Sequence, residues 1–405
     1  MKKFIKRLLF TVFAVLLVIQ VPFIYRRYAT GRLQDSINNL ASIRSARENT
    51  DSQFDEYKGI IHAHTSLGGH STGSFEELID AARDSELDFV VMTEHHSDKL
   101  DTAAMTLNGY YGNTLFVGGN EIDTKDGDRF LLVPGSADAA RFRDVPTTEF
   151  LNTVHRENKL ALVTYPSKFR SWDSEFDGIE TFSLHTAAKQ ANPIMALFDM
   201  IWSFPAYPEL TIARHLSRPN VAKYDEVTGR RRITLSAGTD AHSNIGFHLF
   251  GDDAGNKILN AKVDGYGTIF KLLRVHVLAE KDSEFTQNVL LDSLRQGRAF
   301  VGLDVLGSTE GFSFTAEGSA GGAAMGDEIA FQPGIVLKTA APNKARFIIL
   351  KDGVKFAEAA GDHGLSADVS EPGVYRVEVY LDDLGNPFDE MPWILSNPIY
   401  IRSNR

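Results

Sequence analysis

Short apolar runs alternate with longer amphipathic stretches from Tyr57 to about Leu306. The runs read GIIHAH, LDFVVMT, TLFVGGNE, RFLLVPG, LALVTYP, GIETFSL and RITLSAGTD. Runs of this length predict buried strands, and the stretches between them are long enough for crossover helices. The pattern therefore predicts a parallel α/β barrel-like domain over residues 57–307, with an open doubly wound sheet as the alternative. No G-x-G-x-x-G segment follows the first run, which disfavours the commonest form of that alternative.

Three of the intervening stretches carry clear helix signals. Ser74 and Glu77 form an S-x-x-E capping box that predicts the start of a helix in FEELIDAARDSE. The stretches TTEFLNTVHREN and FTQNVLLDSLRQG also predict helices, and Gly297 ends the second of them.

The composition changes after Gly307. A segment rich in Gly, Ala and Ser is followed by short alternating runs such as GIVLKTAA, ARFIILKDG and GVYRVEVYL, separated by turn signals. This predicts a small all-β, sandwich-like domain over residues 310–405, which could bind a protein partner or cover the barrel.

The N-terminus predicts a membrane anchor. Residues 8–25, LLFTVFAVLLVIQVPFIY, carry no charge and as a helix would cover about 27 Å, close to the hydrocarbon thickness of a bilayer. The exit is bulky and basic, unlike a cleavage site, so we expect an uncleaved signal anchor over residues 1–32 and a polar stalk over 33–56. The basic residues before the run slightly outweigh those after it, which predicts a single-pass inner-membrane protein with its body in the periplasm or exterior. The alternative is a buried helix of a soluble protein.

Charge and cysteine content exclude several classes. The first 32 residues hold seven Lys and Arg, and the remainder carries 35 basic against 53 acidic residues. Non-specific nucleic-acid binding is therefore not expected, although a local cationic pocket could still take a small anion. The absence of cysteine excludes disulfides, thiol catalysis, Cys-ligated zinc and a lipoprotein anchor.

Histidines and carboxylates follow the predicted strands. His62 and His64 end the first run at i, i+2 spacing, and the same spacing relates Asp240 and His242. Glu94, His95 and His96 end the second run, and Glu121 ends the third. Since functional groups in parallel α/β barrels gather at the carboxyl ends of the strands, we expect these side chains to converge on a metal site. Imidazole and carboxylate suit zinc, manganese and iron.

The motifs HAH at 62–64, His70, TEH at 93–95, GNE at 119–121 and GTDAH at 238–242 resemble the PHP family, named for polymerase and histidinol phosphatase domains. The resemblance covers roughly residues 57–305, and the order of the motifs and their strand context agree with the family. It implies a distorted (β/α)7 TIM-like barrel, divalent metals and metal-dependent hydrolysis, most often of phosphate esters. The membrane-anchored subgroup with a C-terminal β-domain looks most similar.

Carried over to this sequence, the resemblance implies one metal held by His62, His64, Glu121 and Asp240. A second would be held by His70, His95 and His242, which gives two ions in all. The chain departs from the family at two positions. Tyr165 stands where the family has a histidine before proline, and Phe130 stands where a second histidine falls. His185 lies near another strand end and could substitute.

Catalytic roles are expected for Glu121, Asp240 and His96, the last as an acid/base group. Lys168 and Arg170 follow a predicted strand and are expected to bind a small anionic substrate, with plain loop cations as the alternative. His155 is expected on a helix surface. Three function classes follow: a membrane-tethered phosphoesterase, a metallohydrolase of non-phosphate esters or carbamates, and a non-enzymatic binding module with a reduced metal site.

Overall fold

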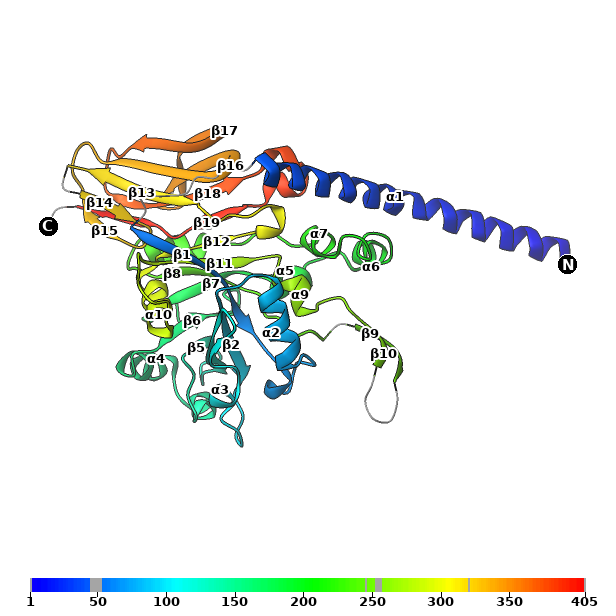
Figure 1. Cartoon of the computed structure of the whole chain (residues 1–405), viewed down its shortest axis with the longest axis horizontal. Helices are drawn as coiled ribbons and strands as arrows, with labels where there is room; N and C mark the ends of the chain where they lie inside the picture. Colours follow the sequence, from blue (N-terminus) through cyan, green and yellow to red (C-terminus); the bar gives the residue numbers. More distant parts are fainter. Residues whose placement is uncertain (1, 44–52, 245, 252–256, 320, 404–405) are drawn as a thin grey trace.

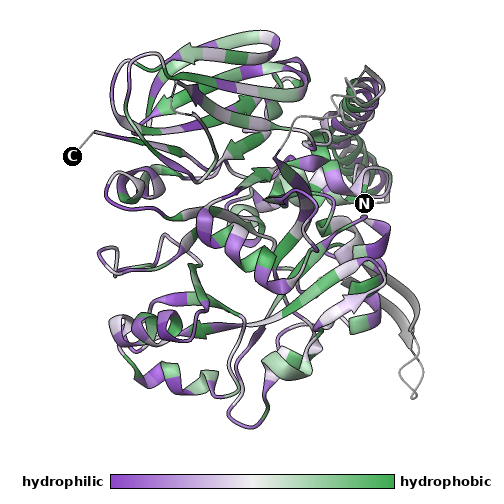
Figure 2. Ribbon diagram, turned by 60° about the vertical axis from the view of Figure 1, so that its left-hand side comes forward, coloured by the Kyte–Doolittle hydropathy of each residue, from purple (hydrophilic) through white to green (hydrophobic). Residues whose placement is uncertain are grey.

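The computed structural model describes residues 2–43, 53–244, 246–251, 257–319 and 321–403. It has a long N-terminal helix, a mixed α/β body and a C-terminal group of strands (Figure 1). Figure 2 shows that the apolar residues concentrate on the strands and on the sides of the helices that face them.

Helix α1 (Lys2–Ile43) is continuous and projects away from the body (Figure 1). Its length and composition suffice to cross a membrane, although a signal sequence passes the same test. Residues 33–43, predicted as part of a stalk, are instead a docked continuation of this helix. Leu33 and Ile37 are buried and Leu40 packs against the core, because their i, i+4, i+7 spacing forms one apolar stripe. Residues 44–52 of the predicted stalk lie outside the described residues.

The body is built on a mixed sheet. Strands β1, β2 and β4 are parallel neighbours, and so are β6, β7 and β8. Between these two sets, β5 pairs antiparallel with both β4 and β6. On the other side of β1, β11 and then β12 continue the sheet in antiparallel fashion. The strands are β1 (Phe54–Ala63), β2 (Phe89–His95), β4 (Thr114–Asp123), β5 (Arg129–Val133), β6 (Leu160–Val163), β7 (Gly178–Ser183), β8 (Thr234–Gly238), β11 (Arg274–Glu280) and β12 (Ala299–Gly302).

The expectation of an all-parallel sheet was therefore wrong at β5. The connection from Asp123 to Arg129 is a tight turn with Gly127 at φ 80°. A parallel pair requires a crossover of a dozen residues or more. Because this link is much shorter, β4 and β5 form a hairpin.

The sheet is not closed into a barrel, because β8 and β1 are not joined by a continuous ladder of hydrogen bonds. Where β8 approaches β1, the described residues form one isolated parallel bridge, between Ala63 and Ala241. Three backbone hydrogen bonds cross this gap: Thr239 N to Ile61 O (3.1 Å), Ala241 N to His62 O (3.3 Å) and His64 N to Ala241 O (3.0 Å). The carboxyl ends of β1 and β8 thus meet, although the strands do not pair along their length.

The helices cover the sheet. The predicted capping box forms at Ser74 and Glu77, and helix α10 ends at Gly297 in a left-handed conformation, as expected. The helices of the body are α2 (Phe75–Asp84), α3 (Thr102–Met105), α4 (Thr147–Arg156), α5 (Leu184–Lys189), α6 (Pro193–Trp202), α7 (Pro208–Ala213), α8 (Ala222–Thr228), α9 (Tyr266–Ile269) and α10 (Gln287–Gln296). Strand β3 (Gly109–Tyr111) forms a hairpin with β4, and β9 (Gly246–Gly251) pairs with β10 (Lys257–Lys262).

The C-terminal segment is all-β with short 3-10 turns. It contains β13 (Ser313–Gly318), β14 (Gly321–Ala324), β15 (Glu328–Ala330), β16 (Val336–Lys351), β17 (Val354–Asp368), β18 (Gly373–Tyr380), β19 (Ile394–Ser396) and β20 (Ile399–Arg402). Strand β16 pairs antiparallel with β13, β17 and β18. Strand β19 pairs with β12 of the body, so hydrogen bonds join the C-terminal strands directly to the α/β part.

Candidate metal centre

Four buried side chains converge at the carboxyl-terminal edge of the sheet. His62 and His64 come from the end of β1, Glu121 comes from β4, and Asp240 follows β8. Asp240 Oδ1 lies 3.3 Å from Nε2 of each histidine. Glu121 Oε2 lies 3.5 Å from His62 Nε2 and 3.4 Å from His64 Nε2. The structure thus brings together the four residues predicted to hold the first metal.

The backbone is distorted where these ligands leave their strands. His62 has φ 73° and Asp240 has φ 48°, a left-handed conformation that side-chain-bearing residues rarely adopt. The register between β1 and β2 shifts at His62, so the two histidines converge through a bulge rather than through a regular pleat. Each such residue costs about 1–3 kcal/mol, and conformations of this kind cluster at functional sites.

The donor atoms fit one divalent cation. His62 Nε2, Asp240 Oδ1 and both ring nitrogens of His64 are buried and make no hydrogen bond among the described residues. Leaving such atoms without a partner is costly. In a tetrahedral site with bonds of about 2.0–2.1 Å, ligand atoms lie roughly 3.3–3.4 Å apart. The measured separations of 3.3–3.5 Å match that spacing.

The electrostatics of the cluster favour a positive charge. Burial by itself would lower the pKa of His62, but the carboxylates of Asp240 and Glu180 raise it well above its usual value. Burial lowers the pKa of His64 to about 4, which keeps this imidazole neutral, as a metal ligand must be. Burial would raise the pKa values of Asp240 and Glu121, but the neighbouring histidines hold the pKa of Asp240 well below its usual range and that of Glu121 at about 2.

Glu180 on β7 orients His62. Its Oε2 lies 2.6 Å from His62 Nδ1 and is nearly fully buried. When Nδ1 carries the proton and donates it in a hydrogen bond to this carboxylate, the lone pair of Nε2 is free to bind a metal. This is the usual arrangement around metal-bound histidines. Gly238 makes the contact possible, since a Cβ there would lie 2.0 Å from the Glu180 carboxylate. Sequence reasoning missed Glu180, which stands inside an apolar run; a carboxylate in a buried strand was the available signal.

Each carboxylate of the cluster has its second oxygen occupied. Tyr165 donates from Oη to Asp240 Oδ2 at 2.6 Å, and Arg129 donates to Glu121 Oε1 at 3.2 Å. Arg129 is fixed in turn by two hydrogen bonds to Asp123. The remaining oxygens of Glu121 and Asp240 are those that face His62 and His64. The phenol and the guanidinium therefore stand where these carboxylates could otherwise bridge to a second ion.

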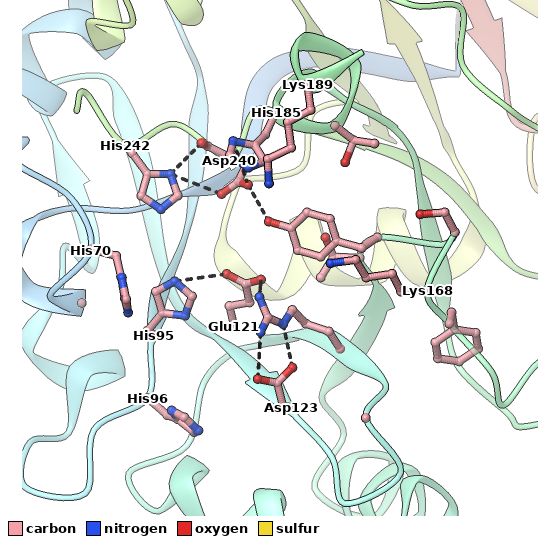
Figure 3. A pocket seen from close by; sticks show the side chains of 18 of the residues that line it. His70, His95, His96, Glu121, Asp123, Lys168, His185, Lys189, Asp240 and His242 are labelled. Atoms are coloured by element: carbon pink, nitrogen blue, oxygen red, sulfur yellow. Dashed lines mark hydrogen bonds and ion pairs between the residues drawn. The ribbon is translucent and has the colours of Figure 1, made fainter. Parts of the chain in front are cut away.

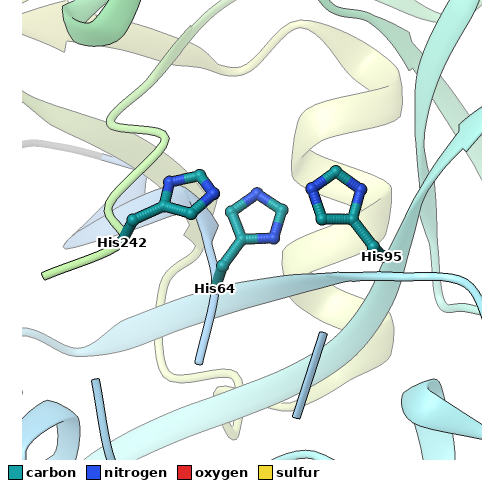
Figure 4. Close-up of side chains that lie close together, drawn as sticks. All are labelled: His64, His95 and His242. Atoms are coloured by element: carbon teal, nitrogen blue, oxygen red, sulfur yellow. The ribbon is translucent and has the colours of Figure 1, made fainter. Parts of the chain in front are cut away.

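A second group of possible ligands consists of His64, His95 and His242 (Figure 4). His242 Nδ1 lies 2.8 Å from the backbone oxygen of Asp240, and His95 Nε2 lies 3.6 Å from Glu121 Oε2. The predicted second set contained His70 in place of His64. His70 is exposed and packs edge-on against His95 with ring centroids 4.8 Å apart. Because the second group shares His64 with the first, the two groups are not independent.

Glu94 holds the loop that follows β1. Its carboxylate accepts hydrogen bonds from the backbone N–H groups of Thr65 and Gly68 and from the hydroxyls of Thr65 and Thr106. Burial raises its pKa. All of its oxygens therefore serve the loop that runs from His64 to His70, and Glu94 is a positioning residue rather than a ligand.

The cluster opens into a pocket of about 940 Å³ (Figure 3). Four cationic side chains line it: Arg129, Arg143, Lys168 and Lys189. Lys168 was predicted to bind substrate, and the structure places it in the wall. Arg170 lies elsewhere, since its backbone N–H donates to Asp128 and its side chain lines a separate depression beside α4.

His96 also lines the pocket, apart from the metal ligands (Figure 3). Arg143 donates to its Nε2 at 2.9 Å, and burial, aided by Arg143, lowers its pKa. Its Nδ1 is buried without a hydrogen bond among the described residues. His96 is therefore a neutral imidazole in the pocket wall.

The remaining residues singled out from the sequence have distinct surroundings. Phe130 is fully buried and packs against Phe150 and Phe169, so its position is part of the core. His185 lies at the pocket with Nδ1 3.8 Å from Asp240 Oδ2. His155 lies on helix α4 and pairs with Asp177 at 3.3 Å.

No protein-family model matches the chain, and no curated protein matches it. Among solved structures, it is similar to the crystal structure of PsfC from Pseudomonas syringae PB-5123. That similarity has a TM-score of 0.35 and 12% sequence identity, and it covers 59% of this chain and 89% of PsfC. A similarity this weak carries no argument about function.

Proposed function

We propose that the chain is a metal-dependent hydrolase of phosphate esters, tethered to a membrane by α1. The observation that carries this proposal is the set of four buried ligand residues, His62, His64, Glu121 and Asp240, whose facing nitrogen and oxygen atoms lie 3.3–3.5 Å apart. On this proposal the mixed sheet, with the carboxyl ends of β1 and β8 in contact, is a distorted PHP-type (β/α)7 barrel. The metal is zinc, manganese or iron.

The site would combine a cation with groups that bind and orient the substrate. A divalent cation supplies a Lewis acid and lowers the pKa of water. Glu180 holds the Nδ1 proton of His62 and so fixes the ring that contributes Nε2. Burial and the carboxylate of Asp240 raise the pKa of Tyr165, so its phenol stays protonated and donates to that carboxylate. His96, neutral in the wall, is the proposed proton acceptor or donor.

The cationic wall supports an anionic substrate. Lys168 and Lys189 line the pocket, and neither forms a salt bridge with another of the described residues. Arg143 contacts His96 and pairs with Asp98 at 3.6 Å. Carboxylates also line the pocket and both arginines are paired with acidic side chains, so the support for a phosphate group comes from Lys168 and Lys189.

The proposed location is a membrane, with the body outside the cytoplasm. Helix α1 continues past the apolar run without a break and is docked on the body through Leu33 and Ile37. Cleavage after the apolar run would remove Phe23, which stacks on Phe198 of helix α6. This contact favours a retained anchor over a cleaved signal sequence.

Two measurements on the purified full-length protein test the function: its metal content, and its hydrolysis of phosphomonoesters, phosphodiesters and carboxyl esters. We expect one equivalent of divalent metal and metal-dependent release of phosphate or alcohol from a phosphate ester. Hydrolysis of carboxyl esters alone would support the non-phosphate hydrolase instead.

One observation favours a second candidate, a non-enzymatic module with a reduced metal site. Tyr165 and Arg129 occupy the oxygens of Asp240 and Glu121 that would serve a second ion. Bound metal without hydrolysis of any ester class would support this candidate and contradict the enzyme.

A further inference from the structure

Helix α6, with the sequence PIMALFDMIW, is a short apolar helix beside the base of α1 (Figure 1). Its start is well defined, because Asn192 caps it and Pro193 occupies its first turn. Nine of its ten residues are uncharged, and Asp199 is the exception.

One side of α6 is fixed to α1. Phe198 stacks on Phe23 with ring centroids 4.3 Å apart, and Trp202 Nε1 donates to Gln20 Oε1 at 2.8 Å. These partners lie within the last two turns of the uncharged run at 8–25. Since each residue of a helix rises about 1.5 Å, α6 lies at the depth where that run ends.

Asp199 does not present a bare charge to the surroundings. Its carboxylate is nearly fully buried, accepts two hydrogen bonds from Arg26 and lies 3.0 Å from His215 Nε2. Two further charged groups lie nearby: Arg214 donates to Thr30 of α1, and Arg27 of α1 donates to the backbone oxygen of Trp202. All of these groups lie on the side of α6 that faces α1 and α7.

The neighbouring face of α6 is apolar and exposed. Ile194, Leu197 and Ile201 are 66%, 59% and 56% exposed. Their i, i+3, i+7 spacing places them on one face. On α1, Val21 and Ile24 are likewise exposed, by 60% and 46%.

We propose that α6 is an interfacial helix whose Ile194, Leu197 and Ile201 face enters the same bilayer that α1 spans. The inference rests on the proposed membrane location of α1. Lipid is the occupant because α6 is held at the depth of the apolar run, where α1 itself is surrounded by acyl chains. An amphipathic helix with its charge turned inward and an apolar face outward is suited to that layer.

The position of α6 also sets an upper limit on the distance between the bilayer and the pocket. Three residues, 190–192, connect α6 to α5, which carries His185 and Lys189 into the pocket wall. A link of that length spans at most about 14 Å from the last residue of α5 to the first of α6. The rim of the pocket therefore lies close to the membrane surface.

The absence of cysteine allows a direct test with the full-length protein. Single-cysteine variants Leu197→Cys and Ile201→Cys are labelled with bimane and reconstituted into phosphatidylcholine–phosphatidylglycerol vesicles. Quenching is compared for a nitroxide-bearing lipid and for aqueous iodide. Val15→Cys in α1 is the reference within the bilayer, and Val354→Cys on β17, which is 70% exposed, is the reference in water.

We expect the ratio of lipid to iodide quenching at Leu197 and Ile201 to exceed that at Val354 several-fold and to approach that at Val15. If Val15 is quenched by lipid while both α6 positions behave like Val354, α6 lies in water and the inference is overturned. Shielding of both α6 positions from both quenchers would mean that protein, such as a second copy, covers this face, which also overturns it. Quenching of Val15 by iodide would instead overturn the membrane location itself.

Discussion

Glu180 Oε2 lies 2.6 Å from Nδ1 of His62, and the opposite nitrogen of the same ring lies 3.3 Å from Asp240 Oδ1. One buried carboxylate therefore fixes the ring while a second faces its free donor. The replacement Glu180→Gln keeps the size of the side chain and removes the charge that holds the Nδ1 proton.

We expect Glu180→Gln to weaken divalent-metal affinity by about 10- to 100-fold, because partners of this kind orient metal-bound histidines. Competition with a fluorescent chelator measures the change. Glu149→Gln, on the exposed side of α4, is the matched control and should bind metal like the wild type. Unchanged affinity in Glu180→Gln would show that the hydrogen bond to His62 is irrelevant to ligation.

Asp240→Ala should abolish activity and reduce metal content while the protein stays folded. The substitution removes the carboxylate oxygen that faces the Nε2 atoms of both His62 and His64. Elemental analysis and circular dichroism measure metal and fold. His155→Ala, which breaks a pair with Asp177 on the helix surface, should alter neither metal content nor activity.

Tyr165→His tests the number of ions, because it introduces the histidine that the proposed resemblance to the PHP family would place at this position. We expect the ratio of metal to protein to stay near one. Phe130, at the other position where the family has a histidine, packs in the core, and Arg129 still donates a hydrogen bond to Oε1 of Glu121. Tyr165→Phe, which removes the hydroxyl alone, is the control. A rise towards two ions per chain in Tyr165→His would contradict the expectation.

His276 should make stability depend on pH, far from the metal centre. Burial would lower its pKa, but Asp304 and Glu56 raise it to about 9 from the usual 6.5. Because the folded pKa exceeds the unfolded one, the contribution is fully present below pH 6.5 and is lost as the pH rises through about 9.

The contribution is at most about 3 kcal/mol. Urea unfolding of wild type and His276→Gln across this range should show a difference in stability that is largest at the acidic end and shrinks at the alkaline end. A difference that stays constant with pH would mean that His276 carries no extra proton in the folded state.

The retained anchor predicts the mass of the mature protein. Peptide mapping by mass spectrometry of protein extracted from membranes should find residues 8–25 and so a mass that includes the anchor, because α1 supplies partners for Phe198 and Asp199. Removal of residues 1–32 should leave these side chains exposed and make the body prone to associate, as size-exclusion chromatography would measure. A shortened N-terminus in the native protein would contradict the anchor.

The residues that converge at the strand ends could be predicted because the signal is local. His62 with His64, and Asp240 after β8, follow from strand length and from the rule that functional groups gather at carboxyl ends. The same holds for the capping box at Ser74, which needs only its neighbours three residues away.

The groups that complete the site could not be predicted in this way. Glu180 and Arg129 reach their partners across the sheet, and their roles depend on which strands are neighbours. The second group contains His64 where the prediction had His70, and this difference depends on how Glu94 holds the loop between the two histidines. The contact of α6 with α1 joins segments far apart in the chain, and composition does not encode it.

The incomplete pairing of β1 with β8 gives the metal centre a mechanical consequence. Three backbone hydrogen bonds and one from the Thr239 hydroxyl to the backbone oxygen of His62 cross that gap, and His62, His64 and Asp240 stand on its two sides. A cation bound by these residues would link the two strand ends, and its binding free energy would contribute to keeping them together. Chelation should therefore accelerate amide hydrogen exchange at the ends of β1 and β8 before it affects the strands at the centre of the sheet.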